Sequence, residues 1–159
     1  MIWPFRRYDL LVLVVCTANV CRSPAAEALL KKHLARDPAG KRVRVWSAGT
    51  AVGAPGRRPD PRVVEVGASL GANLRGIRAK AIDIKDLQAA DVVWVMEAEH
   101  HRAIEEAFAE FSDKVSLFDS ANQNIEDPYY GSKAQVREVI EVIDRIAADR
   151  AGQILNDLH

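Results

Sequence analysis

Short apolar runs alternate along this chain with longer amphipathic segments. The first run, at residues 9–15, is a nearly continuous series of Leu and Val, which is typical of a strand buried on both faces. Other apolar or alternating runs predict strands at residues 42–46, 91–96 and 115–118. Apolar spacings of three and four predict a helix after each strand, at residues 25–34, 61–70, 98–111 and 134–158.

This alternation of strands and helices predicts the fold class. Strands joined by helices form a parallel sheet that is covered by helices on both faces. We therefore expect a single three-layer α/β domain over residues 1–159, with a four-stranded parallel sheet and with residues 1–8 as a loose N-terminal tail. Ligands bind beyond the carboxyl ends of such strands, so the loops of interest begin at Cys16, Ser47, Glu97 and Asp119.

Composition and charge exclude several classes of protein. Hydrophobic residues make up 48% of the 159 residues, which excludes a disordered chain. Basic and acidic residues number 22 each, so the formal net charge is zero and we expect no nucleic-acid partner. The two cysteines, Cys16 and Cys21, are too few for a disulfide framework and fit a reducing compartment. The apolar runs are too short for a signal peptide or a spanning helix, so we expect a cytoplasmic protein without membrane insertion.

The segment V-V-C-T-A-N-V-C-R-S-P carries the strongest chemical signal. Cys16 ends the first strand, and Ser23 and Pro24 open a helix as its N-cap and first residue. Arg22 offers paired donors to phosphate oxygens, and the positive surroundings, with a hydroxyl donor from Ser23, would stabilise a Cys16 thiolate. The backbone N–H groups of the tight loop converge on an anion at the helix N-terminus, and these loop residues are Thr17, Ala18, Asn19, Val20 and Cys21.

A nucleophile inside such an oxyanion cradle suits phosphoryl transfer through a cysteinyl-phosphate intermediate. The alternative is that Cys16 is a small buried hydrophobic residue and that Arg22 is a solvated surface residue. The position of the whole motif between a buried strand and a helix favours the anion site.

This segment resembles the phosphate loop of the low-molecular-weight protein tyrosine phosphatases. The resemblance extends from residue 10 to about residue 146 and includes W-S-A-G-T at 46–50, A-D-V-V-W-V-M-E at 90–97 and E-D-P-Y-Y-G at 126–131. It implies that Cys16 is the nucleophile, that Arg22 clamps the phosphate and that Asp127 acts first as an acid and then as a base. It also implies a reaction without a metal or other cofactor, and polar support of the loop by Asn19, Ser23 and Ser47.

Two positions depart from the pattern of this family. The family usually has glycine where Ala18 stands, and a positive φ there would strain an alanine. The family commonly has histidine where Ile77 stands, and that histidine helps to hold the loop asparagine. The absence of this histidine puts the hydrogen-bond network of Asn19 in question.

Three Asp-Pro pairs compete for the role of the acid. Asp37 follows a helix and therefore lies at the wrong end of the sheet. Asp60 lies on the functional side, but N-capping of the next helix explains it sufficiently. Asp127 follows the fourth strand, and the neighbouring Tyr129 and Tyr130 would wall a slot for an aromatic leaving group. We therefore expect Asp127 to be the acid.

Other reactive or charged residues have alternative interpretations. Cys21 is either a small packing residue or a redox partner that forms a disulfide with oxidised Cys16. The cluster of Arg57, Arg58 and Arg62 is either a solvated loop or a rim that favours acidic or multiply phosphorylated partners. The adjacent residues His100 and His101 are expected on a helix surface and not in a metal site.

These observations predict an enzyme that hydrolyses phosphotyrosine in proteins and binds phosphate or similar oxyanions as product or inhibitor. The loop at residues 47–60 resembles that of bacterial members paired with tyrosine kinases of capsule and exopolysaccharide synthesis, so such a kinase is one expected partner. An alternative is arsenate reduction with an external thiol. A thioredoxin-coupled version needs cysteines beyond Cys21, which the sequence lacks. A phosphate-binding module that has lost catalysis is disfavoured, because Cys16, Arg22 and Asp127 are all present.

Overall fold

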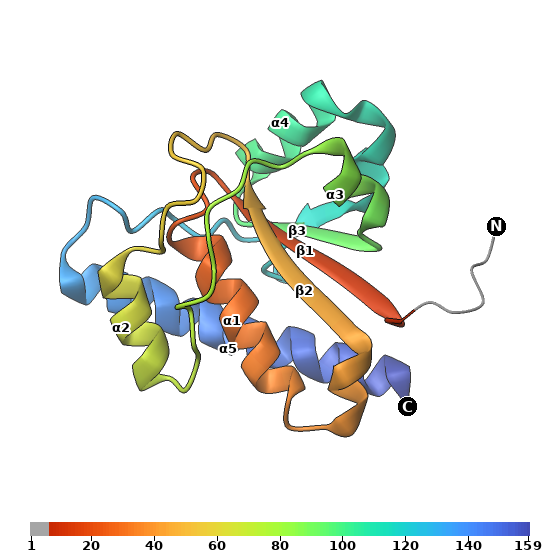
Figure 1. Ribbon diagram of the computed structural model, residues 1–159, viewed down its shortest axis with the longest axis horizontal. Helices are drawn as coiled ribbons and strands as arrows, with labels where there is room; N and C mark the ends of the chain where they lie inside the picture. The colour runs from red at the N-terminus through yellow and green to blue at the C-terminus, as the bar shows by residue number, and fades with distance from the viewer. Residues whose placement is uncertain (1–6) are drawn as a thin grey trace.

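A parallel sheet of four strands forms the middle layer of the structure (Figure 1), a computed structural model that describes residues 7–159. The strands lie in the order β2-β1-β3-β4, and their bounds are β1 Leu10–Cys16, β2 Val43–Gly49, β3 Val92–Val95 and β4 Val115–Leu117. Each of the three neighbouring pairs is parallel. The predicted parallel sheet is therefore confirmed.

Helices cover both faces of this sheet. Successive strand residues point to opposite sides, and both sets of β1 side chains are apolar, so each face needs a cover. Val12 and Val14 of β1 join the core under three helices, α1 Arg22–Leu34, α2 Pro61–Ser69 and α5 Lys133–Leu158. Leu13 and Val15 of the same strand join a smaller core under two helices, α3 Ile84–Ala89 and α4 Ala98–Ala107. The three-layer α/β prediction is confirmed.

The strand order also places the site. The chain passes from β1 to β2 on one side and later returns to β3 on the other side of β1. The carboxyl end of β1 is therefore the point where the winding of the sheet reverses, which is where open α/β sheets form their binding crevice. The loop after Cys16 begins at this point.

The helix boundaries differ from the predictions in three places. Helix α1 begins at Arg22, so Ser23 is not its N-cap, and the N-cap residue Cys21 makes no side-chain capping bond. Helix α3 was not predicted, although Asp83 and Asp86 form a capping box at its start. The predicted helix over 98–111 ends at Ala107 and is followed by a 3-10 helix, Ala109–Lys114, whose Ser and Asp residues are weak helix formers.

Backbone and capping hydrogen bonds hold the end of the sheet that lies away from the site. Most of the expected tail at residues 1–8 lies outside the described residues, and β1 is anchored by a hydrogen bond from the Asp9 backbone N–H to the Arg42 carbonyl at 2.7 Å. A second 3-10 helix, Pro38–Arg42, precedes β2 and is N-capped by Asp37, at the end of the sheet away from the site. Across residues 7–159, no helix combines the length and the apolar character needed to span a bilayer.

Candidate active site

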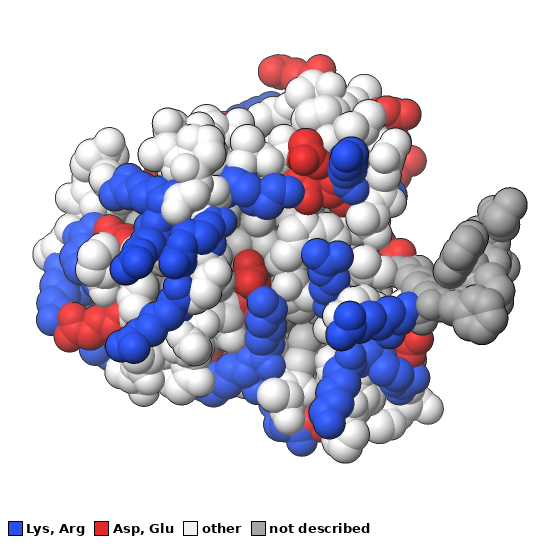
Figure 2. Space-filling model, viewed as in Figure 1, with Lys and Arg blue, Asp and Glu red and all other residues white. Residues whose placement is uncertain are grey.

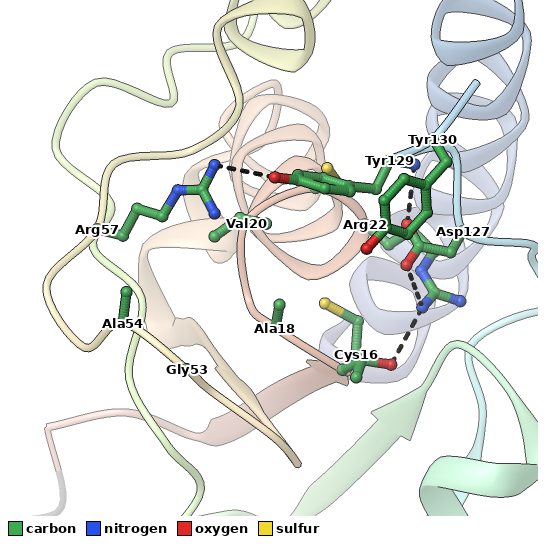
Figure 3. A pocket seen from close by; sticks show the side chains of 12 residues that line it. Cys16, Ala18, Val20, Arg22, Gly53, Ala54, Arg57, Asp127, Tyr129 and Tyr130 are labelled. Carbon is green, nitrogen blue, oxygen red and sulfur yellow. Dashed lines mark hydrogen bonds and ion pairs between the residues drawn. The ribbon is translucent and has the colours of Figure 1, made fainter. Parts of the chain in front are cut away.

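A pocket of about 480 Å³ opens at the carboxyl end of β1 (Figure 3). The loop between β1 and α1 forms its floor, and the segment around Asp127 approaches from the other side. The lining residues are Cys16, Thr17, Ala18, Val20, Cys21, Arg22, Gly53, Ala54, Arg57, Asp127, Tyr129 and Tyr130. Of the residues predicted for the site, only the three expected loop supports, Asn19, Ser23 and Ser47, do not line this pocket.

The backbone of the loop is arranged to receive an anion. Within residues 7–159, the N–H groups of residues 17–21 make no hydrogen bond to a protein acceptor. The loop passes so close to β2 that a Cβ atom on Gly49 would lie 2.4 Å from the Thr17 carbonyl oxygen. Glycine is therefore required at position 49, and the uncommitted donors of the loop are available to an oxyanion.

Cys16 lies at the base of the pocket with a polar partner. Its side chain is buried, and its Sγ lies 3.0 Å from Ser23 Oγ. Ser23 lies in the first turn of α1, so its hydroxyl faces the sulfur instead of capping the helix. A hydrogen bond donated by this hydroxyl stabilises a thiolate at the position of Cys16.

A buried network supports the loop from behind. The Asn19 side-chain amide donates to Ser23 Oγ at 2.8 Å and to Ser47 Oγ at 3.0 Å, and its carbonyl oxygen accepts from the Lys80 backbone N–H at 3.0 Å. Ser47 in turn donates to Glu27 Oε1 at 2.7 Å. The network of Asn19 is therefore complete without the histidine that Ile77 replaces, because Glu27 and the Lys80 backbone supply partners.

The alanine at position 18 carries no backbone strain. The loop residue with positive φ is Asn19, at 58°, and Ala18 is not among the positive-φ residues of the described chain. Asparagine tolerates this left-handed conformation better than most residues. The substitution of alanine for the usual glycine is therefore compatible with the loop.

Arg22 is buried and oriented from two sides. One guanidinium nitrogen donates to Glu97 Oε2 and to the Ile125 carbonyl, both at 2.7 Å. The other terminal nitrogen lies 3.4 Å from Thr17 Oγ1 and 3.8 Å from Asp127 Oδ2, on the pocket side. The first nitrogen anchors the group, so the second is held ready for a bound oxyanion.

Asp127 lies beside Arg22 at the pocket, and a dashed line marks their ion pair in Figure 3. Its Oδ1 accepts the Tyr129 backbone N–H at 3.0 Å, which leaves Oδ2 toward the pocket. Tyr129 is half-buried, whereas Tyr130 is 94% exposed, and their rings meet edge to face at 4.9 Å. Tyr129 therefore forms a wall, and Tyr130 forms the outer rim.

Asp60 is the predicted N-cap and has a further role. Its Oδ1 accepts the Arg62 backbone N–H at 2.9 Å, and its carboxylate also pairs with the Arg62 guanidinium. That guanidinium donates to the carbonyls of Tyr129 and Gly131, both at 2.8 Å. The backbone N–H of Asp60 donates to the Val20 carbonyl. The Asp60–Arg62 pair therefore connects the loop between β1 and α1 to the segment that carries Asp127.

Cys21 lies buried beside this pair, with its Sγ 4.0 Å from Asp60 Oδ2. Burial, together with the Asp60 carboxylate, raises the pKa of the Cys21 thiol to about 12. Cys21 therefore remains a neutral thiol at physiological pH, and both cysteines are free.

The expectation that His100 lies on a helix surface is wrong. His100 is 1% exposed, its Nδ1 accepts the Glu97 backbone N–H at 3.1 Å, and its Nε2 therefore carries the proton that is donated to Thr17 Oγ1 at 2.8 Å. Burial, and then the positive charge of Arg22, lower the pKa of His100 to about 4. A neutral histidine therefore holds the side chain of Thr17.

The sequence did not predict three residues that organise the site, Glu27, Glu97 and His100, and it offered Arg62 only as part of a solvated loop or a rim. One signal was present, since Glu97 directly follows a buried strand at the functional edge of the sheet. The others are recognised only from contacts between distant segments.

The chain matches the family described as low molecular weight phosphotyrosine protein phosphatase over residues 11–158. It is 34% identical over 147 residues to the low molecular weight protein-tyrosine-phosphatase Wzb of Escherichia coli strain K12, covering 91% of this chain and 95% of Wzb. Among solved structures it resembles Vibrio vulnificus Wzb in complex with benzylphosphonate, with a TM-score of 0.84, 28% identity and coverage of 91% of this chain and 98% of that one.

A second solved structure is a cysteine-to-serine mutant of the arginine phosphatase YwlE with a phosphorylated active-site serine. Its TM-score is 0.87 and its identity 27%, and the match covers 94% of this chain and 100% of that one. The family match runs from within β1 to the end of α5.

Proposed function

The chain belongs to the low molecular weight phosphotyrosine protein phosphatase family, and from this premise we propose that it hydrolyses phosphotyrosine through a phosphocysteine formed on Cys16. The observation that carries the proposal is the convergence of Cys16, Arg22 and Asp127 on one pocket. The phosphorylated serine of the YwlE mutant supports a covalent intermediate at the nucleophile.

The first step is attack on phosphorus by the Cys16 thiolate. The free N–H groups of residues 17–21 and the pocket-side nitrogen of Arg22 bind the phosphoryl oxygens as charge spreads over them in the transition state. The S–P bond forms while the bond between phosphorus and the tyrosine oxygen breaks. Asp127, which enters this step protonated, donates its proton to the departing phenolate.

The second step returns the enzyme to its starting state. The Asp127 carboxylate takes a proton from a water molecule, and the resulting oxygen nucleophile attacks phosphorus. The S–P bond breaks, and inorganic phosphate leaves with the Cys16 thiolate restored. Ser23, at 3.0 Å from the sulfur, stabilises the thiolate as leaving group.

The walls of the pocket favour an aromatic leaving group. Tyr129, Val20 and Ala54 offer apolar contact, and Asp127 stands where the phenolic oxygen would depart. Vibrio vulnificus Wzb, with a similar fold, is described in complex with benzylphosphonate, which joins a phenyl ring to a phosphonate.

Phosphoarginine is the second candidate substrate, because the YwlE structure is that of an arginine phosphatase. The guanidinium of Arg57 lies at the rim, over the ring of Tyr129 at 5.7 Å, and Asp127 is the single carboxylate among the lining residues. A cationic rim opposes a guanidinium leaving group, so tyrosine is favoured.

We extend the proposal to the setting of the reaction. A phosphotyrosine-containing protein, such as a bacterial tyrosine kinase of capsule or exopolysaccharide synthesis, is the proposed partner. The two free cysteines support action in the cytoplasm, where thiols stay reduced.

Steady-state turnover of a phosphotyrosine peptide, a phosphoarginine peptide and arsenate with glutathione tests the proposal. The wild type is expected to prefer the phosphotyrosine peptide, and Cys16→Ser is expected to lose at least about 1,000-fold in kcat because a serine hydroxyl is scarcely ionised. Circular dichroism and phosphate binding serve as controls for folding. Preferred turnover of phosphoarginine or arsenate, or retained activity in Cys16→Ser, would refute the proposal.

A further inference from the structure

A second hollow, of about 540 Å³, lies beside the catalytic pocket, between the loop after β2 and the segment after α2. Three arginines and an apolar floor line it, namely Arg58, Arg75 and Arg78 with Pro59, Pro61 and Val64. Figure 2 shows Lys and Arg gathered over the part of this face where α2 and its flanking loops lie. The whole chain has a formal net charge of zero, so this concentration of positive charge is local.

The three guanidinium groups are not neutralised by the protein. Within residues 7–159, none of them forms an ion pair with a carboxylate, whereas arginines elsewhere do, such as Arg42 with Asp9 and Arg62 with Asp60. Two acidic residues nearby already have basic partners: Asp60, between two prolines of the lining, pairs with Arg62, and Glu65, which lines an adjoining hollow, pairs with Lys133 at 3.0 Å. The positive potential of this hollow is therefore available to a ligand.

The backbone holds one of the three arginines in place. The Arg78 guanidinium donates to the carbonyls of Arg75 and Ile77 at 2.8 and 2.9 Å. The Ala79 backbone N–H donates to the Arg57 carbonyl, and the Gly56 N–H donates to the Ala79 carbonyl, which ties the two segments together. Less ordering of Arg78 and of the two backbone segments is therefore needed when a ligand binds.

We infer that this hollow is a second, non-hydrolytic phosphotyrosine subsite that binds another phosphotyrosine of the same substrate protein. Guanidinium groups match phosphate oxygens in paired geometry, and the Pro59, Pro61 and Val64 floor offers apolar contact to the ring. The lining contains no cysteine, so the bound group is held and not hydrolysed. This inference rests on the proposed function, because it assumes that phosphotyrosine proteins are the substrates.

The loop after β2 links the two sites. Arg57 lines the catalytic pocket and its neighbour Arg58 lines the hollow, so the sites lie on two sides of one short stretch of chain. A substrate segment with two phosphotyrosines would occupy both sites at once, and the second contact would become intramolecular. Multiply phosphorylated segments would then be captured at lower concentration than singly phosphorylated ones.

The test compares peptides that differ at a second tyrosine. Initial rates are measured for a doubly phosphorylated peptide, for the same peptide with one phosphotyrosine, and for a version with glutamate at the second position. The wild type is expected to show a KM at least about fivefold lower for the doubly phosphorylated peptide, which exceeds the roughly twofold statistical advantage of two sites. The glutamate peptide is expected to behave like the singly phosphorylated one.

The variant Arg58→Gln/Arg75→Gln removes two of the three cations and leaves Arg78, which binds backbone carbonyls. It is expected to abolish the KM advantage while kcat and KM for p-nitrophenyl phosphate stay within about twofold of wild type. The matched control, Arg102→Gln/Arg145→Gln, removes two exposed charges from α4 and α5 and is expected to retain the advantage.

The inference is overturned if the wild type has the same KM for the doubly and the singly phosphorylated peptide, or if the glutamate peptide has a KM as low as the doubly phosphorylated one. It is overturned as well if the control variant loses as much of the KM advantage as Arg58→Gln/Arg75→Gln does. It is also overturned if anionic phosphatidylserine vesicles bind through Arg58 and Arg75 while the peptides do not differ. Failure of the proposed function looks different, because the wild type would then turn over none of the phosphotyrosine peptides.

Discussion

The carboxylate of Asp60 and the guanidinium of Arg62 form a two-point ion pair, with Arg62 Nε 3.1 Å from Oδ1 and a terminal nitrogen 2.9 Å from Oδ2. The pair holds Arg62 so that its remaining donors reach the carbonyls of Tyr129 and Gly131. The hydrogen bonds of Arg62 lower the pKa of Asp60, which keeps the pair charged at neutral pH. Asp127 is thus positioned by a residue far away in the sequence.

Replacing Arg62 by Ala is expected to loosen the segment that carries Asp127. Small misplacements of a reacting group are costly, so kcat for a phosphotyrosine peptide should fall about 10- to 100-fold, with a smaller loss for p-nitrophenyl phosphate. Steady-state kinetics on both substrates measure this split. The control is Arg137→Ala, which removes a half-exposed partner of Glu141. Equal behaviour of the two variants would show that Arg62 does not position the acid.

Replacing Arg22 by Lys keeps the positive charge but removes the guanidinium group with its two terminal nitrogens. An ammonium group cannot hold Glu97 and the Ile125 carbonyl and also reach the phosphoryl oxygens. We expect a loss of at least about 100-fold in kcat/KM, comparable to the removal of a preorganised oxyanion donor. Kinetics near wild type would place Arg22 outside the transition-state contacts.

Replacing Asp127 by Ala should affect substrates according to their leaving group. General acid catalysis contributes about 100- to 10,000-fold, and a poor leaving group such as tyrosine needs it most. Turnover of p-nitrophenyl phosphate, whose phenolate departs readily, should fall less. Asp60→Ala should lower thermal stability through the lost N-cap, by about 0.5–2 kcal/mol, and because it also frees Arg62, its effect on turnover should be no larger than that of Arg62→Ala. If Asp60→Ala gives the leaving-group pattern and Asp127→Ala does not, the acid assignment is wrong.

Stability at acid pH should depend on His100. Burial lowers its pKa to about 4 in the folded protein, from an ordinary value of 6.5. Between these values the unfolded chain binds a proton that the folded chain does not, so the free energy of unfolding falls as the pH is lowered through this window. Across the whole window, His100 is expected to lower the free energy of unfolding by about 3 kcal/mol.

The variant His100→Gln should flatten this pH dependence, as measured by urea denaturation between pH 7 and pH 4. The control is His101→Gln, which changes the neighbouring histidine that contacts Ser112. The same flattening in both variants would contradict the assignment to His100.

Oxidation should inactivate the enzyme reversibly through Cys16. Peroxide oxidises the thiolate to a sulfenic acid, and the Cys21 thiol then displaces water to form the Cys16–Cys21 disulfide. Cys21, with a pKa of about 12, is itself protected from peroxide at neutral pH. Cys21→Ser should therefore lose activity less reversibly. Recovery by dithiothreitol after equal peroxide doses measures the difference, and equal recovery would count against a protective disulfide.

The local pattern of the sequence was sufficient for the fold class, and together with the resemblance to a family it singled out the residues that are proposed to perform the chemistry. A run of Leu and Val that ends at Cys16 specifies a buried strand, and the tight loop before α1 follows from Ser23, Pro24 and the helical segment after them. These features depend on neighbours in the chain, so they are readable without a structure. The exact start of α1 was not, because the hydroxyl of Ser23 could either cap the helix or face Cys16.

Only the tertiary structure decided which residues support the site. Glu97 holds Arg22 across 75 positions, His100 holds Thr17 across 83, and Lys80 supports Asn19 across 61. Such contacts depend on the order of the strands and on how helices pack over them, which a local pattern does not encode. His100 illustrates the reason: its neighbours in sequence suggest a solvated helix, and only the packing of α4 beside the loop buries it against Thr17.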